Sequence, residues 1–535
     1  MAKSPLTVTV ITDTHYYAKS NGVEGAAYDA ANTKSQLLLK DAAELLDAAF
    51  RQIKADKRTD IVLLSGDTTS NGDYDSHKEF IEMLRDLKAS GKRVYVLTAT
   101  HDYQDDGQTN AYSGDEKVKI PAAKREELFE MYREFGPDEA ISVHRDSMSY
   151  VVQLQDGYRL FAINDDRNLQ GKSGISDDCY QWLSEQAEDA RKNGQFILAM
   201  THHPLIAPSP IYALIGKNDM HGDFDVRRKQ YADLGLQFML TGHTHIHHID
   251  KIQSDRGNTL YTIATAATVG YPAPIRTVVV DEAAGIVSTT TDLITEKVNC
   301  ELDNNNLQEH LKNQMIGMVR DLVKAAGGDI HKFADMVTAM SIKKKVIYKY
   351  GWLIRPFAKA LNKLTIGKVA KWTKKETGLK PEDYADIKDK SVVDFIADMA
   401  LNLYAGENLY EPEDAEYKIT MGLLSIFDSI FAALHISVRK LLKVSDSLCD
   451  FVEPLLHNSG IPAYNAVLPI MPYYAEGEQG PAEKEPEKPV YPKSKKGVPI
   501  VILLILGVII LLIPLLLVLG IGFIVNQVRY GRFMK

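Results

Sequence analysis

Short apolar runs alternate with helical stretches over the first 300 residues of the chain. The runs predict buried strands, and they are Val8–Ile11, Ile61–Leu64, Val94–Leu97, Leu160–Ile163, Phe196–Met200 and Phe238–Leu240. Between the first two runs, apolar residues from Leu38 to Ile53 recur at spacings of three and four, which predicts an amphipathic helix. This alternation indicates an α/β domain, which we place at residues 1–298.

The pattern changes after about residue 300. Amphipathic helical segments with few strand candidates predict a mostly helical region over residues 299–471, whose role the pattern does not reveal. Residues 472–497 are rich in Pro, Glu, Lys and Gly, so we expect a solvated, partly extended linker there.

The segment from Val498 to Val525 contains no charged residue. As a helix it would measure about 42 Å, whereas the hydrocarbon core of a bilayer is about 30 Å thick. A globular helix does not need apolar residues on all faces over this length, so we predict a transmembrane helix, tilted or bent at Pro514, with residues 526–535 as a short tail. Because the first residues lead directly into a strand with no signal-peptide pattern, we expect a single-pass C-terminal anchor in the cell membrane and a cytoplasmic catalytic domain.

The overall composition excludes several classes of protein. The chain has 535 residues, with 62 Lys and Arg against 71 Asp and Glu, a net charge of −9 that argues against a dedicated nucleic-acid binder. Its 3 cysteines are scattered and odd in number, so they cannot form a disulfide framework, and a reducing compartment is expected.

One part of the helical region is strongly basic. Residues 343–375 hold eleven Lys and Arg and no Asp or Glu, interleaved with aromatic residues. Two interpretations stay open: a helix on an anionic membrane surface, or a solvated basic face packed against the acidic remainder of the chain. Nucleic-acid binding ranks below both because the stretch lacks a recognised module.

Polar clusters rich in Asp and His follow five of the predicted strands. The clusters are Asp13-Thr14-His15, Gly66-Asp67, Thr100-His101-Asp102, His202-His203-Pro204 and Gly242-His243-Thr244-His245. Each alone is compatible with an ordinary turn. Together they are expected to converge, because ligands of α/β sheets bind at the carboxyl ends of the strands.

The residue types in these clusters suit a metal site. Asp and His without Cys favour borderline or hard divalent ions such as Mn, Fe, Co, Ni or Zn. In Asp13-Thr14-His15 and His243-Thr244-His245 the spacing of two puts both side chains on one face if the backbone is extended.

The order Asp13-x-His15, Gly66-Asp67, His101-Asp102, His202-x-Pro204, Gly242-His243-x-His245 resembles the calcineurin-like metallophosphoesterase superfamily, specifically its cyclic-nucleotide phosphodiesterase-like bacterial branch. The resemblance covers about residues 6–298 and extends to the segments 66–72, 132–136 and 270–276. It implies a metallophosphoesterase-type β-sandwich flanked by helices, with a dinuclear metal site. The expected fold class is therefore α/β, followed by the helical region and the transmembrane helix.

The resemblance also implies a role for each matching residue. Asp13, His15 and His245 would hold the first metal, His202 and His243 the second, and Asp67 would bridge both. His101 would protonate the leaving oxygen or position the phosphate, with Asp102 fixing its orientation. We interpret His203 as structural, and His247 and His248 as peripheral.

Thr100 departs from the family pattern. The family usually has Asn before this His, and the Asn amide oxygen binds the second metal. A threonine hydroxyl is a shorter and weaker neutral ligand, so the second metal would bind loosely, recruit a water or be absent.

These features predict a membrane-anchored, metal-dependent phosphoesterase with two divalent ions. It would hydrolyse a phosphodiester, phosphomonoester or pyrophosphate bond by attack of a metal-bridging hydroxide, on a nucleotide or lipid-linked substrate. Two alternatives remain: a non-catalytic metal-binding sensor or scaffold that retains the fold, and a nucleotidase for soluble substrates whose helical region forms a dimer. Whether chains pair as homo-oligomers is left open.

Overall fold

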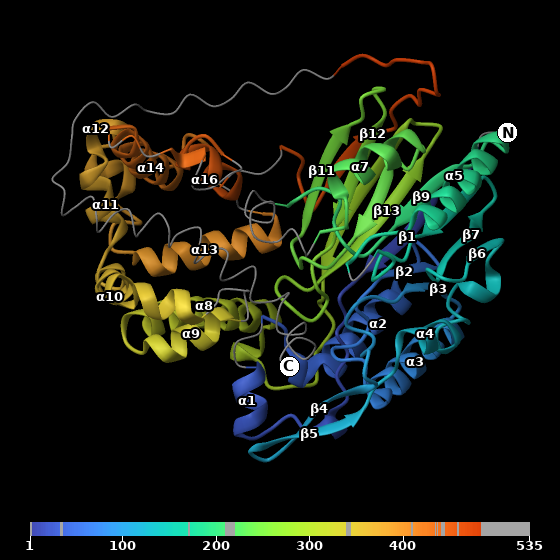
Figure 1. Ribbon diagram of the computed structural model, residues 1–535, viewed down its shortest axis with the longest axis horizontal. Helices are drawn as coiled ribbons and strands as arrows, with labels where there is room; N and C mark the ends of the chain where they lie inside the picture. Colours follow the sequence, from blue (N-terminus) through green and yellow to red (C-terminus); the bar gives the residue numbers. More distant parts are fainter. Residues whose placement is uncertain are drawn as a thin grey trace.

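A computed structural model describes residues 3–482, except 33–35, 170–171, 209–219, 339–343, 408–409, 434, 436, 440–444 and 457–459 (Figure 1). The strands are β1 (Leu6–Ile11), β2 (Ile61–Ser65), β3 (Arg93–Leu97), β4 (Gln108–Ser113), β5 (Glu116–Pro121), β6 (Ser142–His144), β7 (Ser149–Gln155), β8 (Tyr158–Ala162), β9 (Phe196–Met200), β10 (Phe238–Thr241), β11 (His248–Gln253), β12 (Thr259–Ala264), β13 (Pro274–Asp281), β14 (Ile286–Leu293) and β15 (Ala466–Pro469). They form a six-stranded sheet in the order β15-β14-β13-β1-β2-β3, a seven-stranded sheet in the order β11-β12-β10-β9-β8-β7-β6, and the separate hairpin β4-β5.

The two large sheets share one apolar core. Val8 and Val10 of β1 are fully buried in the same cluster as Leu160 of β8 and Leu198 of β9. Because side chains alternate along a strand, each sheet turns a second apolar face outward. Helices α2 (Ala42–Ala55) and α3 (Tyr74–Ala89) cover that face of the first sheet, and α5 (Asp177–Lys192) and α7 (Phe224–Asp233) that of the second.

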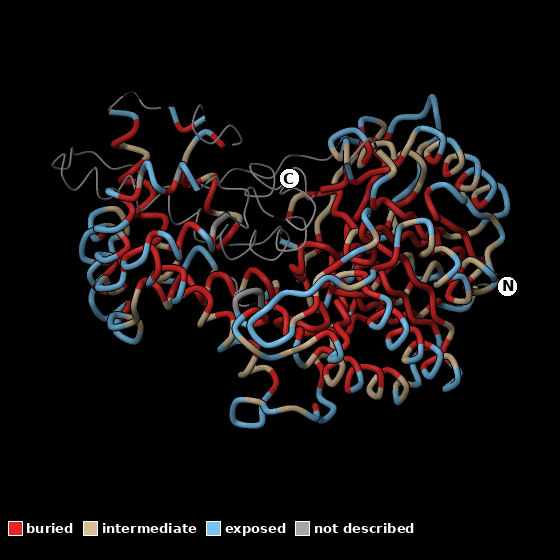
Figure 2. Tube along the Cα trace, turned by 60° about the horizontal axis from the view of Figure 1, so that its bottom comes forward, coloured by how far each residue is buried: buried red, intermediate tan, exposed pale blue. Residues whose placement is uncertain are grey.

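This arrangement confirms the predicted α/β sandwich flanked by helices, and Figure 2 shows the buried chain concentrated within it. All six predicted strands are present, as β1, β2, β3, β8, β9 and β10. The predicted helix over Leu38–Ile53 is α2, preceded by the 3₁₀ turn Leu39–Asp41.

The carboxyl ends of the parallel strands meet at one rim of the sandwich. Strand β1 is parallel to β2, and β2 to β3, while β8, β9 and β10 are parallel in the other sheet. The two rims touch: Nδ1 of His202, just after β9, lies 2.9 Å from the carbonyl oxygen of Ser65 at the end of β2. Residues that follow these strands are therefore brought together from both sheets.

The chain after the sandwich is mostly helical, as predicted. Its helices are α8 (Leu307–Gly327), α9 (Ile330–Thr338), α10 (Lys344–Leu361), α11 (Ile366–Trp372), α12 (Lys374–Thr377), α13 (Val392–Ala405), α14 (Ala415–Ala433) and α16 (Leu448–Leu456), and they lie beside the sheets in Figure 1. The helices α1 (Ala26–Asn32) and α4 (Arg125–Met131) belong to the sandwich half of the chain.

The helical region ends in a strand that the sequence pattern did not predict. Strand β15 pairs antiparallel with β14 and becomes the edge of the six-stranded sheet. The start of the predicted linker then follows the second sheet, where the Tyr474 amide donates to the Asn258 side chain (2.8 Å) and the Gly480 amide to the Arg256 carbonyl (2.8 Å). We call residues 466–481 the C-terminal strap.

The predicted transmembrane helix at 498–525 lies outside the described residues. Within the described part of the chain, we find no helix that combines the length and apolar character needed to cross a bilayer.

Candidate metal centre

Five of the six predicted ligands lie at positions of left-handed backbone. The φ angles are +50° at Asp13, +38° at His15, +51° at Asp67, +69° at His243 and +57° at His245. Such angles are strained for residues with a side chain and occur preferentially at functional sites. The pairing of side chains two residues apart was predicted for an extended backbone, but the backbone is left-handed at these positions. Asp13 and His15 do share one group, whereas His243 and His245 belong to different groups.

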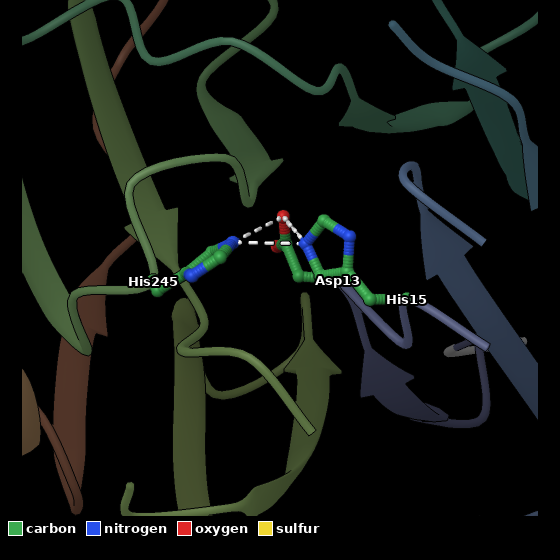
Figure 3. Close-up of side chains that lie close together, drawn as sticks. All are labelled: Asp13, His15 and His245. Carbon is green, nitrogen blue, oxygen red and sulfur yellow. Dashed lines mark hydrogen bonds and ion pairs between the residues drawn. The ribbon is translucent and has the colours of Figure 1, made fainter. Parts of the chain in front are cut away.

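Asp13, His15 and His245 form the first group (Figure 3). The carboxylate oxygen Oδ1 of Asp13 lies 3.2 Å from Nε2 of His245 and 3.7 Å from Nε2 of His15. The two imidazole Nε2 atoms lie 3.1 Å apart. All three side chains are buried, so three potential ligand atoms converge within the protein.

Asp67, His202 and His243 form the second group. Nε2 of His202 lies 3.0 Å from Oδ2 of Asp67 and 3.3 Å from Nδ1 of His243. The groups adjoin, because Nε2 of His202 is also 3.9 Å from Oδ1 of Asp13. The structure thus brings together all six residues that the sequence places at strand ends.

The electrostatics of the two groups fit a cation. Burial raises the pKa of Asp67, but His101 and His202 outweigh it and hold the pKa well below its ordinary value. Burial lowers the pKa of His202, yet Asp67 and Asp13 raise it to about 10. Two ionised carboxylates therefore hold a positive charge at His202, and a divalent ion could replace that proton.

Two glycines leave space for the ligands. A Cβ atom at Gly66 would clash with the His202 ring, and one at Gly242 with the Asp13 carboxylate. Gly66 also has a φ of +115°, which favours glycine.

His101 forms a third group with His15 and Asp67, and its ring is fixed. Its Nδ1 is 3.0 Å from the carbonyl oxygen of Ser70, so Nδ1 carries a proton and donates it there. Its Nε2 therefore faces the site, 3.6 Å from Oδ2 of Asp67. Burial lowers the pKa of His101, which leaves the ring neutral near pH 7 in the metal-free chain.

Asp102 does not orient the His101 ring, so its predicted catalytic role needs correction. Its carboxylate accepts the backbone amides of Thr68 (3.2 Å), Thr69 (2.7 Å) and Ala99 (2.8 Å) and the hydroxyls of Thr68 (2.7 Å) and Thr69 (3.0 Å). These bonds tie the loop after β2 to the turn that holds His101. Asp102 therefore positions the backbone of these two segments.

Thr100 precedes His101 in this turn and is partly buried. Its role as a ligand in place of the usual Asn stays a prediction.

The remaining histidines are packed behind the ligands. His203 is fully buried, with its ring centre 4.2 Å from that of His243 and its Nδ1 3.2 Å from Asp165. Burial raises the pKa of Asp165, but His203 and His221 lower it to about 2, so its carboxylate is ionised. These contacts agree with a structural role for His203.

His247 and His248 lie beyond the two groups. His247 is fully buried, and its Nε2 accepts a hydrogen bond from Arg276 (2.5 Å). His248 begins β11, and its Nε2 lies 3.7 Å from Asp250.

Gln36 is a contact that the sequence did not reveal. Its side chain is buried, and its amide lies 2.5 Å from Nδ1 of His245. It comes from the segment before α2, where no strand end marks it, and the neighbouring Leu38 amide bonds the Val269 carbonyl (2.8 Å). The bridge of this segment to the loop after β12 helps to place Gln36 at the site.

Residues 6–247 match the model of a family described as calcineurin-like phosphoesterase. This part of the chain is a calcineurin-like phosphoesterase domain. The protein is thus a metal-dependent phosphoric ester hydrolase, as predicted. The buried Asp and His groups are the donor set that divalent metal ions take in such a domain.

Two solved structures are similar to the phosphoesterase domain. One is a dimetal phosphatase from Danio rerio, with 13% identity over 54% of this chain and 96% of that one, and a TM-score of 0.39. The other is a conserved uncharacterized protein, a predicted phosphoesterase, from Streptococcus pneumoniae, with 10% identity over 56% of this chain and 94% of that one, and a TM-score of 0.20. The comparison with curated proteins gave no match.

Proposed function

We propose that the protein is a membrane-anchored phosphoesterase that works with two divalent metal ions. The convergence of six buried Asp and His side chains in two adjoining groups carries this proposal. Asp13, His15 and His245 would hold one ion and His202 and His243 the other, with Asp67 reaching both. The metals would be Mn, Fe, Zn, Co or Ni, which suit imidazole and carboxylate donors.

Bound ions of this kind act as Lewis acids on the phosphoryl oxygens and lower the pKa of water. The residues of the chain itself would orient the reacting groups. The Ser70 carbonyl fixes the His101 ring with Nε2 toward the ligands, at the place where a phosphoryl group would sit. Only the protonated ring carries a proton on Nε2, which it can donate to the leaving oxygen or to a phosphate oxygen that it positions.

Hydrolysis of bis-p-nitrophenyl phosphate by the full chain, with Mn²⁺ supplied, tests the enzyme proposal together with metal content per chain. We expect two ions per chain and activity that His101→Ala lowers about 100-fold or more while the metal content is kept. Asp178→Asn, on the exposed end of α5, is the control and should change neither value. A wild-type chain that binds no metal and leaves this substrate intact would contradict the proposal.

The non-catalytic sensor remains the second candidate because of Thr100. Thr100→Asn restores an amide oxygen at that position. If the second ion binds loosely for want of this ligand, Thr100→Asn raises its affinity and the rate together. Equal metal content with no hydrolysis in both proteins would favour the sensor.

The substrate would be a nucleotide or a lipid-linked phosphate, and the cyclic-nucleotide phosphodiesterase-like branch is one prediction within this range. Comparing turnover of cyclic nucleotides with that of lipid phosphates separates the two classes. Anchoring would come from residues 498–525, with the catalytic domain on the cytoplasmic side, and it favours neither class.

A further inference from the structure

Helix α10 packs against its neighbours through one narrow face. The buried residues Ile347, Gly351, Ile354, Ala358 and Leu361 recur at spacings of three and four and so line one side of the helix. That side lies against α8 and α9. Gly351 allows close approach, because a Cβ atom there would lie 3.2 Å from Ile330.

The opposite side of α10 is basic and aromatic. Successive helical residues are about 100° apart, which places Trp352 nearly opposite the packed side. Trp352 is 75% exposed and Tyr348 is 44% exposed. Lys345, Arg355 and Lys359 are exposed on the same side. We call these five residues the α10 face.

Among the described residues, the cations of the α10 face form no close ion pair, although Arg355 interacts electrostatically with Asp329. An ion pair on this helix joins Lys344 to Asp335, and no described carboxylate lies within 4 Å of Lys345, Arg355 or Lys359. The next helices, α11 and α12, also expose basic and aromatic side chains. Lys371 and Lys375 are exposed, and Trp372 is 51% exposed. Of the two interpretations of this stretch, the exposed cations and rings of α10 favour a helix on a membrane surface over a solvated basic face packed against the acidic remainder of the chain.

We propose that the α10 face docks on the surface of an anionic lipid bilayer. Aromatic rings sit at the level of the lipid headgroups, and Lys and Arg are attracted to anionic lipids within about 8 Å at physiological salt. The cations surround Trp352, so one flat anionic surface can take all five side chains at once. An acidic protein would need a pocket shaped for Trp352 in addition to its charge.

This inference rests on the proposed anchoring. From residue 482 to residue 498 the chain can span at most about 55 Å, so a helix at 498–525 would hold the whole head near the bilayer. The α10 face would then fix how the head lies on that bilayer.

The test uses the full chain with Trp182→Phe and Trp372→Phe, which leaves Trp352 as its one tryptophan. The chain is inserted into lipid nanodiscs that contain brominated lipid, either zwitterionic only or mixed with an anionic lipid. We expect quenching and a blue shift of Trp352 emission in the anionic discs, both lost in high salt, and emission like that in water in the zwitterionic discs. Equal emission in the two kinds of disc would overturn the proposal.

Charge reversal separates this face from the rest of the surface. Lys345→Glu with Lys359→Glu should reduce the quenching to the zwitterionic level. Lys117→Glu with Lys119→Glu, on the exposed strand β5, makes the same change in net charge and should leave the quenching intact. Equal effects of the two double variants would contradict docking through α10.

Failure of anchoring gives a different result. If the chain does not insert into discs at all, the proposed transmembrane helix is contradicted. The same chain is then floated with anionic vesicles, where binding that depends on Lys345 and Lys359 supports the α10 face and absence of binding rejects it.

Discussion

At the scale of single residues, Gln36 shows how the chain outside the strand ends prepares a ligand. For His245 to bind a cation through Nε2, the neutral ring carries its proton on Nδ1. The group next to Nδ1 must then be an acceptor. Among the described residues Oε1 of Gln36 has no hydrogen-bond partner, and turning the amide by 180° places that oxygen on Nδ1. Gln36 therefore fixes the tautomer and the direction of His245.

We predict that Gln36→Leu weakens metal binding at the first group by about 10- to 100-fold, the usual cost of losing such a partner. Gln36→Glu keeps an acceptor for Nδ1 and should retain most of the affinity. Equilibrium dialysis with Mn²⁺ measures both without a substrate. Gln153→Ala, which loses hydrogen bonds to the carbonyls of Gln155 and Tyr158, is the control away from the site. Equal affinity of the Leu variant and the wild type would contradict this role.

The sequence predicts which residues reach the centre but not how. Asp13, His15 and His245 follow strands, so their meeting at one rim could be inferred from strand ends alone. Their left-handed backbone could not, because nothing in the Asp-x-His or His-x-His spacing distinguishes it from a strand. The presence of Gln36 at the site was harder still to predict, because its position depends on a bridge between segments more than 200 residues apart.

At the scale of elements, α3 is joined to the metal loops through His77. Its Nε2 donates to the Asp102 carbonyl (2.8 Å), and its Nδ1 accepts from the Tyr132 hydroxyl (2.9 Å). The ring is fully buried, and this burial lowers its pKa despite the nearby Asp102. It is thus neutral in the folded chain at pH values where an exposed histidine is protonated.

This difference predicts how stability changes with pH. Below about pH 6.5 the unfolded chain takes up a proton on His77 that the folded chain refuses, so stability falls as the pH falls. Between pH 7.5 and 5.5 the loss from this group is at most about 1.4 kcal/mol. Urea unfolding of the metal-free protein at both pH values measures it, and His77→Gln should show a smaller decrease than the wild type. Parallel decreases in the two proteins would refute the assignment.

Strand β15 is one of the elements that join the helical region to the sandwich. Its side chains alternate, with Ala466 and Leu468 buried and Val467 exposed. The register places Leu468 opposite Val287 of β14, in the core between the sheets. The strand ends in Pro469 and exposes every second side chain, so no buried apolar run marked it in the sequence.

We predict that Leu468→Ala destabilises the sandwich by about 2–3 kcal/mol, near the lower end for buried leucines because β15 lies at a sheet edge. Val467→Ala, which removes an outward side chain that is 67% exposed, should change the free energy of unfolding by less than about 0.5 kcal/mol. Urea denaturation followed by tryptophan fluorescence compares them. If both variants behaved alike, β15 would not be part of the core.

At the scale of the whole molecule, the C-terminal strap sets where the chain leaves the head. It runs along both sheets, so the described part of the chain ends at residue 482 on the sandwich and not on the helical region (Figure 1). Alternation of strands and helices predicted the α/β class, and the resemblance to a known family implied the sandwich. The return of the chain after the helices is a tertiary contact, and local pattern does not encode it.

The apolar segment at 498–525 follows the strap in the sequence, and its proposed role as a transmembrane helix can be tested by substitution. A charged residue at the centre of a transmembrane helix costs about 2.5–3.5 kcal/mol, so Ile509→Asp with Ile510→Asp would cost about 5–7 kcal/mol of insertion free energy. We expect this double variant to be extracted from membranes by alkaline carbonate, whereas the wild type and the control Ile509→Leu with Ile510→Leu stay in the pellet. Hydrolysis of a soluble phosphodiester should be unchanged in all three, since the strap and the metal centre are untouched. Retention of the Asp variant in the pellet would show that this segment does not span the bilayer.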